Sequence, residues 1–223
     1  MTILTCNDPW VHLAPRSLRA ACRAIAIAVL TIGIFVPLTS LADDQTTLET
    51  VHRDITERYS AVQHMSGAEL AAQLRDARAR EEIVLFDVRE AEEFAVSRLN
   101  GAERIEPGVW TSSFMRAHGD RIRGKTVVFY CSVGARSSYA ASYLADDLKA
   151  AGATRVVNLE GGIFAWHNAA RPLADKHGAT RFVHPYDAKW GRYVDRGALT
   201  RYAPRPSVDV PPVSSSIPGA ATQ

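Results

Sequence analysis

The sequence predicts an α/β fold, a doubly wound domain with a mostly parallel central sheet and helices on both faces. Three short runs of apolar and β-branched residues, at 83–88, 125–130 and 155–162, have the composition of strands buried on both faces. Segments with the apolar spacing of helices lie between and after these runs. Strands that alternate with helices in this way form βαβ units, and such units place their strands parallel in one sheet.

The first half of the chain supplies two predicted helices and the first strand. Residues 45–64 are polar with spaced apolar positions, which predicts an amphipathic helix. Ser66 and Glu69 stand at capping-box spacing and predict the start of a second helix. The strand at 83–88 comes next, and a short predicted helix over 89–99 follows it.

The second half of the predicted domain repeats this alternation. The strand at 125–130 leads into a helix over 136–152, which Gly152 ends. The strand at 155–162 closes with a glycine turn, and a further helix begins at Ile163. In parallel sheets of this kind, binding sites lie at the carboxyl ends of the strands.

The N-terminal segment has the features of an export signal. Arginines precede an apolar run at 24–36, and the small residues Ser40 and Ala42 follow it. This order is typical of a secretory signal peptide over residues 1–42, cleaved near Ala42. An uncleaved membrane anchor is the alternative, although the run is barely long enough to span a membrane and contains Pro37. We expect an exported protein in the periplasm or an equivalent compartment, with no membrane contact beyond this segment.

Composition and charge narrow the classes of function. The chain has 223 residues, 47% of them hydrophobic and 22% charged, which is typical of a globular protein. Without residues 1–42 the formal net charge falls from +2 to zero, so we expect no nucleic-acid partner. Cys6 and Cys22 lie in that segment, and the mature chain keeps Cys131 alone. A lone thiol in an oxidising compartment is oxidised unless it is buried or used.

The remaining boundaries follow from shifts in composition. Residues 43–65 form a helical lead-in, and residues 66–176 form the α/β domain. Residues 177–203 are rich in aromatics and arginine, and we expect an ordered extension that packs back on the domain. Residues 204–223 are rich in proline and serine and predict a disordered tail. His184, in the extension, either docks on the domain or lines the mouth of the site.

The stretch "CSVGARS" has the features of an anion-binding loop that begins with a nucleophile. Cys131 follows a strand, and Gly134 permits the backbone angles of a tight loop. Ser137 or Ser138 is placed to cap the next helix, so backbone N–H groups of residues 132–136 point inward. Arg136 adds a fixed positive charge, and such an environment favours the thiolate. The candidate nucleophile is therefore Cys131, and the candidate binding residues are Ser132, Val133, Gly134, Ala135 and Arg136.

Two reactions use a thiolate in such a cradle. In one, the thiolate attacks phosphorus; in the other, it attacks a sulfane sulfur and holds it as a persulfide. A tetrahedral oxyanion needs a wider ring of amides than one sulfur atom does. Four residues separate Cys131 from Arg136, and this short loop favours sulfur.

Three blocks of the sequence resemble the rhodanese family in its single-domain form, over about residues 66 to 175. They are "LFDVREAEEF", "YCSVGARSSYAASYL" and "VVNLEGGIFAWHNAARPL". The resemblance implies a rhodanese-like doubly wound domain in which Cys131 takes sulfur from a donor such as thiosulfate and passes it to an acceptor such as cyanide or a thiol. Related tyrosine and dual-specificity phosphatases typically place one more residue between the cysteine and the arginine.

Other positions carry over in supporting roles. The resemblance implies that Asp87 and Arg89 support the loop region. Ser137, as a candidate cap of the following helix, is a third supporting residue. It implies that Gly161, Gly162 and Trp166 are structural. Arg98 stands where the family often has a histidine, so we expect local packing or substrate access to differ there. Ser132 and Val133 lack the basic side chains expected of thiosulfate specialists, which leaves the donor open.

These observations predict an exported sulfurtransferase that works through a Cys131 persulfide. Its expected partners are a small sulfur donor and a nucleophilic acceptor, including a protein acceptor. No organic cofactor is implied, and the histidines show no metal-ligand spacing. A non-catalytic persulfide carrier or binding module is the first alternative, and a small phosphatase or arsenate reductase that uses Cys131 is the second.

Overall fold

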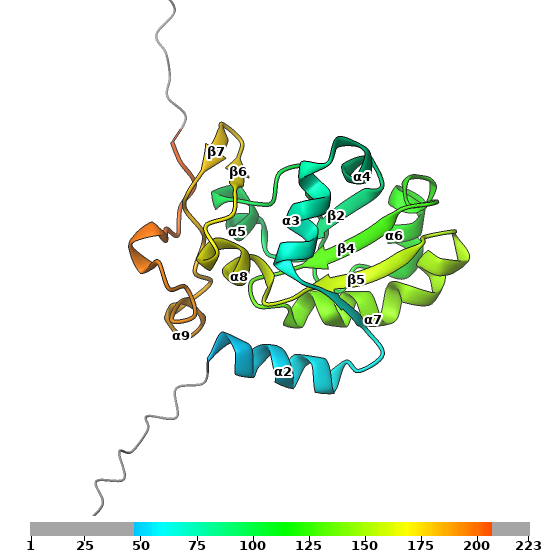
Figure 1. The fold of residues 1–223 in the computed structure, drawn as a ribbon, viewed down its shortest axis with the longest axis horizontal. Helices are drawn as coiled ribbons and strands as arrows, with labels where there is room; N and C mark the ends of the chain where they lie inside the picture. Colours follow the sequence, from blue (N-terminus) through cyan, green and yellow to red (C-terminus); the bar gives the residue numbers. More distant parts are fainter. Residues whose placement is uncertain (1–46, 207–223) are drawn as a thin grey trace, which may run out of the picture. The chain divides into compact units, whose positions relative to one another are not determined.

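The computed structural model describes residues 47–206, and a five-stranded parallel sheet forms its centre (Figure 1). The strand order is β1-β5-β4-β2-β3, and every neighbouring pair is parallel. A separate antiparallel pair, β6 and β7, follows the sheet in the chain. The predicted α/β fold class is therefore confirmed. The strands are β1 (Gln63–Met65), β2 (Ile83–Asp87), β3 (Glu103–Arg104), β4 (Thr126–Tyr130), β5 (Arg155–Leu159), β6 (Leu173–Asp175) and β7 (Gly178–Thr180).

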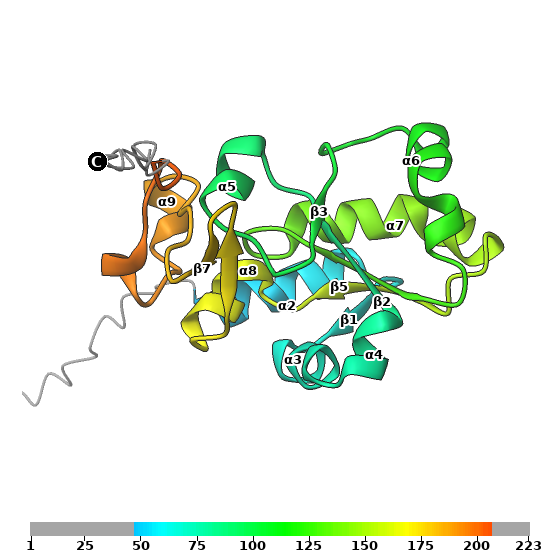
Figure 2. The same ribbon diagram turned by 90° about the horizontal axis from the view of Figure 1, so that it is seen from above.

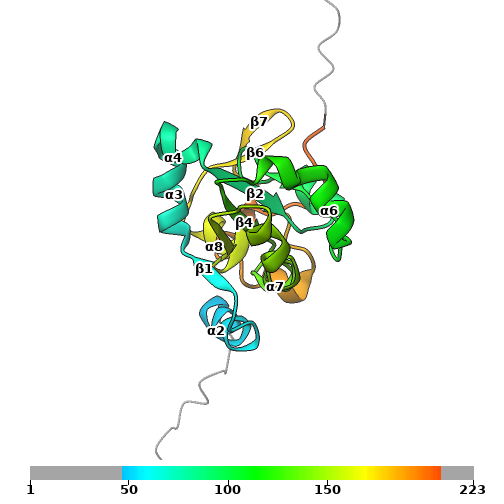
Figure 3. The same ribbon diagram turned by 90° about the vertical axis from the view of Figure 1, so that its right-hand side faces the viewer.

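Helices lie on both faces of the sheet, as the sequence predicts. Helices α3 and α4 lie on one side, and α6 and α7 lie on the other (Figures 2 and 3). The helices are α2 (Leu48–Arg58), α3 (Gly67–Arg75), α4 (Ala77–Glu81), α5 (Ala91–Val96), α6 (Thr111–His118), α7 (Ala135–Ala150), α8 (Gly162–Asn168) and α9 (Ala188–Gly191).

Alternation along the central strands creates two hydrophobic cores. In β4, Val128 and Tyr130 join the core on one face, which includes residues of α3 and α8. Val127 and Phe129 join the core on the other face, beneath α6 and α7. All four side chains are fully buried. Burial on both faces explains why the strand reads as a continuous apolar run.

The N-terminal lead-in differs from the prediction. The helix expected over 45–64 ends at Arg58, and Tyr59 closes it with an N–H bond to the Ile55 carbonyl, 2.9 Å long. Residues Gln63–Met65 form the edge strand β1, which pairs with β5. The prediction of a helix as far as residue 64 is wrong. Met65 is fully buried in the core, and pairing with β5 satisfies the backbone groups of this segment.

The predicted cap at Ser66 is confirmed. The Glu69 N–H donates to Ser66 Oγ over 3.1 Å, at the first turn of α3. The expected single helix beyond it is interrupted, because Asp76 caps a new helix, α4, through the Ala79 N–H at 2.8 Å.

The C-terminal extension packs back on the domain, as expected. Val183, Tyr193 and Val194 are buried in the same core as α8. Asn168 of α8 donates from Nδ2 to the Tyr193 carbonyl at 2.9 Å. The expected signal segment and most of the expected tail lie outside the described residues. No helix within residues 47–206 is long and apolar enough to cross a membrane.

Candidate active site

Cys131 begins the loop between β4 and α7, at the carboxyl end of a central strand. The Gly134 N–H donates to Cys131 Sγ over 3.2 Å, so the loop closes on the sulfur. Gly134 has φ +102°, a left-handed conformation that favours glycine, and it forms the N-cap of α7. The cysteine is 1% exposed. The structure thus places an amide N–H and a helix N-terminus at the sulfur, both of which favour an anion.

The start of α8 holds this loop from the other side. The Ile163 N–H donates to the Cys131 carbonyl over 2.8 Å, and the Phe164 N–H donates to the Ser132 carbonyl over 3.0 Å. These bonds require close contact between two backbones. Gly162 sits at the contact with φ +57°, and a Cβ there would lie 2.3 Å from the Cys131 carbonyl oxygen. Gly162 is therefore needed for the cradle itself.

Arg136 forms an ion pair that the sequence does not predict. Its Nη1 donates to Glu93 Oε2 over 2.8 Å, and its Nη2 donates to Glu93 Oε1 over 3.0 Å. Arg136 Nη2 also donates to Ser132 Oγ at 3.0 Å, and that hydroxyl donates to Glu93 Oε1 at 2.7 Å. Glu93 ties α5 to the cysteine loop. Glu93 stands three residues after Glu90, which is the spacing of a capping box, and this box forms at the start of α5. That spacing is the one local feature of the sequence that marks Glu93.

The charges of this pair are mutually stabilised. Burial alone raises the pKa of Glu93, but the hydrogen bonds and charge of Arg136 outweigh it and lower that pKa. Burial alone lowers the pKa of Arg136, but the Glu93 hydrogen bonds and the nearby charges of Cys131 and Glu93 raise it above its usual range. Both groups are therefore charged at neutral pH, and Glu93 neutralises much of the positive charge beside the thiol.

Asp87 and Arg89 form a fully buried ion pair at the end of β2. Arg89 Nη2 donates to Asp87 Oδ2 over 2.6 Å and to the Ser97 carbonyl over 2.6 Å. Burial alone lowers the pKa of Arg89, but the charge and hydrogen bonds of Asp87 raise it above its usual range. The pair joins β2 to the end of α5, the helix that carries Glu93.

Ser137 does not cap α7. The helix begins at Ala135, because left-handed Gly134 turns the chain one residue before it. Ser137 and Ser138 lie inside the first turn and are buried. Ser137 Oγ donates to Asn158 Oδ1 over 2.6 Å, and this contact ties α7 to β5 behind the loop. The prediction of a serine cap is therefore wrong.

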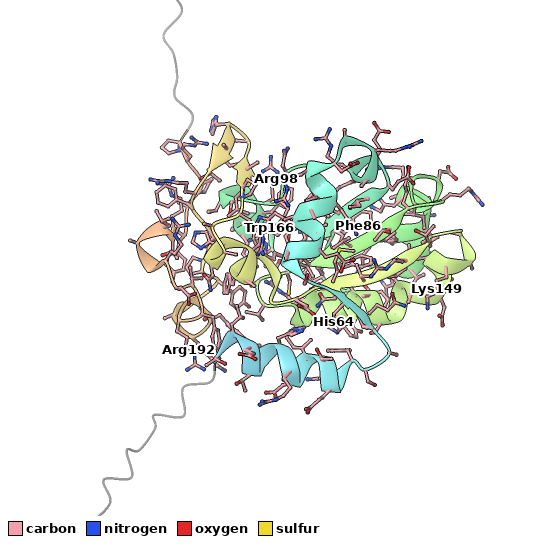
Figure 4. All side chains as sticks on the ribbon, in the orientation of Figure 1. His64, Phe86, Arg98, Lys149, Trp166 and Arg192 are labelled. Atoms are coloured by element: carbon pink, nitrogen blue, oxygen red, sulfur yellow. The ribbon has the colours of Figure 1, made fainter. Side chains whose placement is uncertain are left out.

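A second polar contact extends this link toward α2. Asn158 Nδ2 lies 3.2 Å from His64 Nδ1, and His64 lies beside α2 (Figure 4). The His64 ring centroid is 5.2 Å from that of His52. Burial and the charge of His52 lower the pKa of His64. This histidine packs behind the loop, and its contacts with Asn158 and His52 do not involve the thiol.

The remaining loop residues and Arg98 have separate surroundings. Ser132 and Val133 are buried, and Ala135 is half-buried. Arg98 lies at β6, where its N–H donates to the Ala174 carbonyl over 2.8 Å, and its guanidinium lies 4.7 Å from the Phe94 ring centroid. Figure 4 shows Arg98 away from the labelled core residue Phe86. Within residues 47–206, no group of three or more His, Cys, Asp or Glu side chains is placed to hold a metal ion.

Comparison with known proteins places this geometry in a family. The rhodanese-like domain model matches residues 70–169. A sulfurtransferase of Allochromatium vinosum is 33% identical over 98 residues, which cover 44% of this chain and 84% of that relative. The protein YtwF of Bacillus subtilis is 34% identical over 94 residues, which cover 42% of this chain and 82% of that relative.

A further relative is longer than the region it shares with this chain. The tRNA uridine(34) hydroxylase of Bordetella petrii is 37% identical over 86 residues, 38% of this chain. The match spans only 32% of that relative's length. The family match ends at residue 169, so the C-terminal segment lies outside it.

Proposed function

This chain belongs to the rhodanese-like family, and from that premise we propose that it is an exported sulfurtransferase that carries sulfur as a Cys131 persulfide. The observation that supports this most directly is the Gly134 N–H, which donates to Cys131 Sγ over 3.2 Å inside a short buried loop. A short loop that closes on the sulfur suits one added sulfur atom better than a tetrahedral oxyanion, which needs a wider ring of amides. Its amides and the N-terminus of α7 stabilise the negative charge of a persulfide.

The reaction proceeds in two displacement steps. The Cys131 thiolate attacks the outer sulfur of thiosulfate, the donor's S–S bond breaks, and sulfite leaves with the bonding electron pair. The enzyme then carries a persulfide anion. Cyanide or a thiolate attacks the terminal sulfur, the persulfide S–S bond breaks, and the Cys131 thiolate returns. Thiocyanate or a new persulfide is released, and no external oxidant or reductant is consumed.

The ion pair at Arg136 favours a single sulfur atom on the thiol over a phosphoryl group held in the loop. A phosphate dianion in the loop needs the guanidinium donors that Glu93 and Ser132 occupy. It also meets the Glu93 carboxylate at close range, and like charges at that distance repel. A phosphatase that uses Cys131 is therefore the weaker proposal. Hydrolysis of an aryl phosphate that depends on Cys131 is the result that favours it.

A persulfide carrier without turnover is the second candidate function. The observation in its favour is the 1% exposure of Cys131, which limits access by an acceptor. A carrier binds one sulfur and releases it slowly to small nucleophiles. An enzyme converts many equivalents of thiosulfate and cyanide to thiocyanate, and this difference separates the two.

The test is a steady-state assay of the purified full chain with thiosulfate and cyanide. We expect thiocyanate to form over many turnovers with wild type and to be absent with Cys131→Ser. Cys22→Ser is the matched control and should keep full activity. Thiocyanate formation by Cys131→Ser at the wild-type rate is incompatible with the proposal. A single turnover by wild type supports the carrier instead.

Export rests on residues 1–42, which lie outside the described residues. Expression of the full chain in a bacterial host tests it. We expect the periplasmic fraction to contain a chain whose N-terminus is Asp43. A full-length chain retained in the cytosol is the contrary result.

A further inference from the structure

A residue from the C-terminal segment, outside the family match, lies against the cysteine loop. The Tyr186 ring centroid is 5.1 Å from Arg136 Cζ. Arg136 thus contacts both a carboxylate and an aromatic ring. Such a stack is an attractive contact for a guanidinium. The chain reaches this point from β7 and turns away again toward α9.

The backbone at Tyr186 is held in a conformation that bulky residues rarely adopt. Its φ is +67°, in the left-handed region that favours glycine. The Tyr186 N–H donates to His184 Nδ1 over 3.0 Å. His184 is 8% exposed, and its ring meets that of Tyr202 edge-on at 5.2 Å. His184 therefore docks against its own segment and fixes the turn that presents Tyr186.

This segment is anchored firmly enough to keep the ring in place. The Val183 N–H donates to the Leu199 carbonyl over 3.0 Å, and the Arg201 N–H donates to the Val183 carbonyl over 3.1 Å. Val183 itself is fully buried in the core. A strained tyrosine that is held by a buried anchor at a reactive loop points to a function for its ring.

The loop is exposed to solvent at its Arg136 end and not at its Cys131 end. Residues 131–134 are all buried, and the loop becomes partly exposed only at Ala135 and Arg136. The Arg136 side chain is 28% exposed, and Tyr186, which is 44% exposed, lies over it. The charge of Cys131 contributes to the raised pKa of Arg136, which agrees with a guanidinium close to the sulfur. Tyr186 therefore stands at the partly exposed side of the loop.

We propose that Tyr186 is a specificity-determining residue: its ring forms a wall of the opening to Cys131 and limits the size of molecules that reach the sulfur. The effect of the ring on sulfur donors and acceptors rests on the proposed function, whereas its effect on access to the thiol does not. Small donors and acceptors pass the ring, and bulky ones are slowed. The hydroxyl is not required, because the guanidinium contacts the ring.

Size-selective alkylation of Cys131 in the full chain tests the wall without any sulfur chemistry. N-ethylmaleimide and fluorescein maleimide share one reaction and differ in size, and peptide mapping isolates Cys131 from Cys6 and Cys22. The measured quantity is the ratio of the two labelling rates at Cys131. Tyr186→Ala and Tyr186→Gly should raise the relative rate of the bulky reagent about tenfold. Tyr186→Phe should keep the wild-type ratio.

Two comparisons distinguish loss of the Tyr186 ring from a general loosening of the fold by the substitution. Tyr186→Gly relieves the left-handed strain while it removes the ring, so it keeps the turn. Trp110→Ala removes an 81% exposed aromatic that the structure places at the start of α6, and it should leave the ratio unchanged. Equal ratios in wild type, Tyr186→Ala and Tyr186→Gly overturn the proposal. A Tyr186→Phe ratio that shifts as far as that of Tyr186→Ala also overturns it.

Sulfur transfer then links the wall to the reaction. The ratio of kcat/KM for glutathione to kcat/KM for cyanide should rise in Tyr186→Ala and Tyr186→Gly by about the same factor as the labelling ratio. A wild-type protein that loads no sulfur from any donor contradicts the proposed function, while the labelling ratio still decides the role of Tyr186. An unchanged acceptor ratio, in variants whose labelling ratio has shifted, overturns the specificity role.

Discussion

The cysteine loop and the segment around Tyr186 meet at Arg136, and they differ in where they are anchored. The loop is fixed by backbone groups, since N–H groups of α8 donate to its carbonyls and Gly134 donates to its sulfur. The Tyr186 segment is anchored three residues away from the tyrosine, at Val183, by a buried side chain and by backbone bonds to Leu199 and Arg201. Backbone bonds leave little freedom for substitution, whereas a packed segment accepts a change at its exposed tip.

This difference predicts two kinds of mutant. Changes in the framework of the loop alter folding and the sulfur chemistry together. Changes at the tip of the segment alter access to the thiol and leave the rest of the domain intact.

The largest effect is expected at Gly162. In Gly162→Ala the new Cβ lies 2.3 Å from the Cys131 carbonyl oxygen, so α8 and the loop must separate. We expect thiocyanate turnover to fall about 100-fold or more, because a displaced nucleophile loses its geometry. Gly101→Ala is the matched control, since Gly101 also has a left-handed φ of +82° but has open space at its Cβ. Similar losses in both variants mean that backbone strain, and not the contact with the loop, causes the effect.

The buried ion pair gives the next effect. Asp87→Ala leaves the Arg89 guanidinium buried without its partner, and breaking such a pair costs about 3–5 kcal/mol. Urea unfolding should show this loss in the free energy of unfolding, while exposed Asp120→Ala should change it by less than about 0.5 kcal/mol. A small loss in Asp87→Ala means that the pair is not a support of the fold.

Release of Arg136 gives a smaller effect on donor binding. In Glu93→Gln the guanidinium loses its nearest anionic partner and retains the weaker contact with Glu90, whose Oε1 lies 4.0 Å from Arg136 Nη1. More of its charge is then available to attract a dianion. We expect the KM for thiosulfate to fall about fivefold, since a freed charge–charge contact is worth about 1 kcal/mol near the surface. Glu92→Gln removes an exposed carboxylate from the same helix and should leave KM unchanged. A higher KM in Glu93→Gln contradicts the view that Glu93 neutralises the site.

The smallest expected effect is a loss of unfolding free energy at low pH as Glu93 is protonated. The folded pKa of Glu93 is lower than its ordinary value of 4.5, so its stabilisation is complete above that value and is lost as the pH falls through the folded pKa. Wild type should lose more unfolding free energy than Glu93→Gln between neutral pH and about pH 3. Urea midpoints across this range measure it. Parallel curves for the two proteins contradict the assigned pKa shift.

The sequence predicts the sheet and the loop well because their signals are local. The strands at 83–88 and 125–130 are continuous apolar runs, and the helix after Cys131 follows a clear pattern. The position of the thiol then follows from the rule for parallel sheets. The sequence predicts the serine cap one turn too late, because the backbone angle of Gly134 decides where the helix begins.

Long-range pairings account for what the sequence does not show. Glu93 and Arg136 are separated by 43 positions, and no local pattern connects them. Tyr186 lies in a segment without periodicity, so the sequence predicts that the segment packs on the domain but not which side chain meets the loop. The strand Gln63–Met65 is hidden for a related reason, since only its pairing with β5 defines it.

Mass spectrometry of the Cys131 peptide after incubation with thiosulfate shows whether this cysteine carries sulfur. We predict a gain of one sulfur atom on Cys131 in the wild-type chain, lost when cyanide is added and absent at this position in Cys131→Ser. A wild-type peptide that gains no sulfur from thiosulfate or from an organic persulfide contradicts the account.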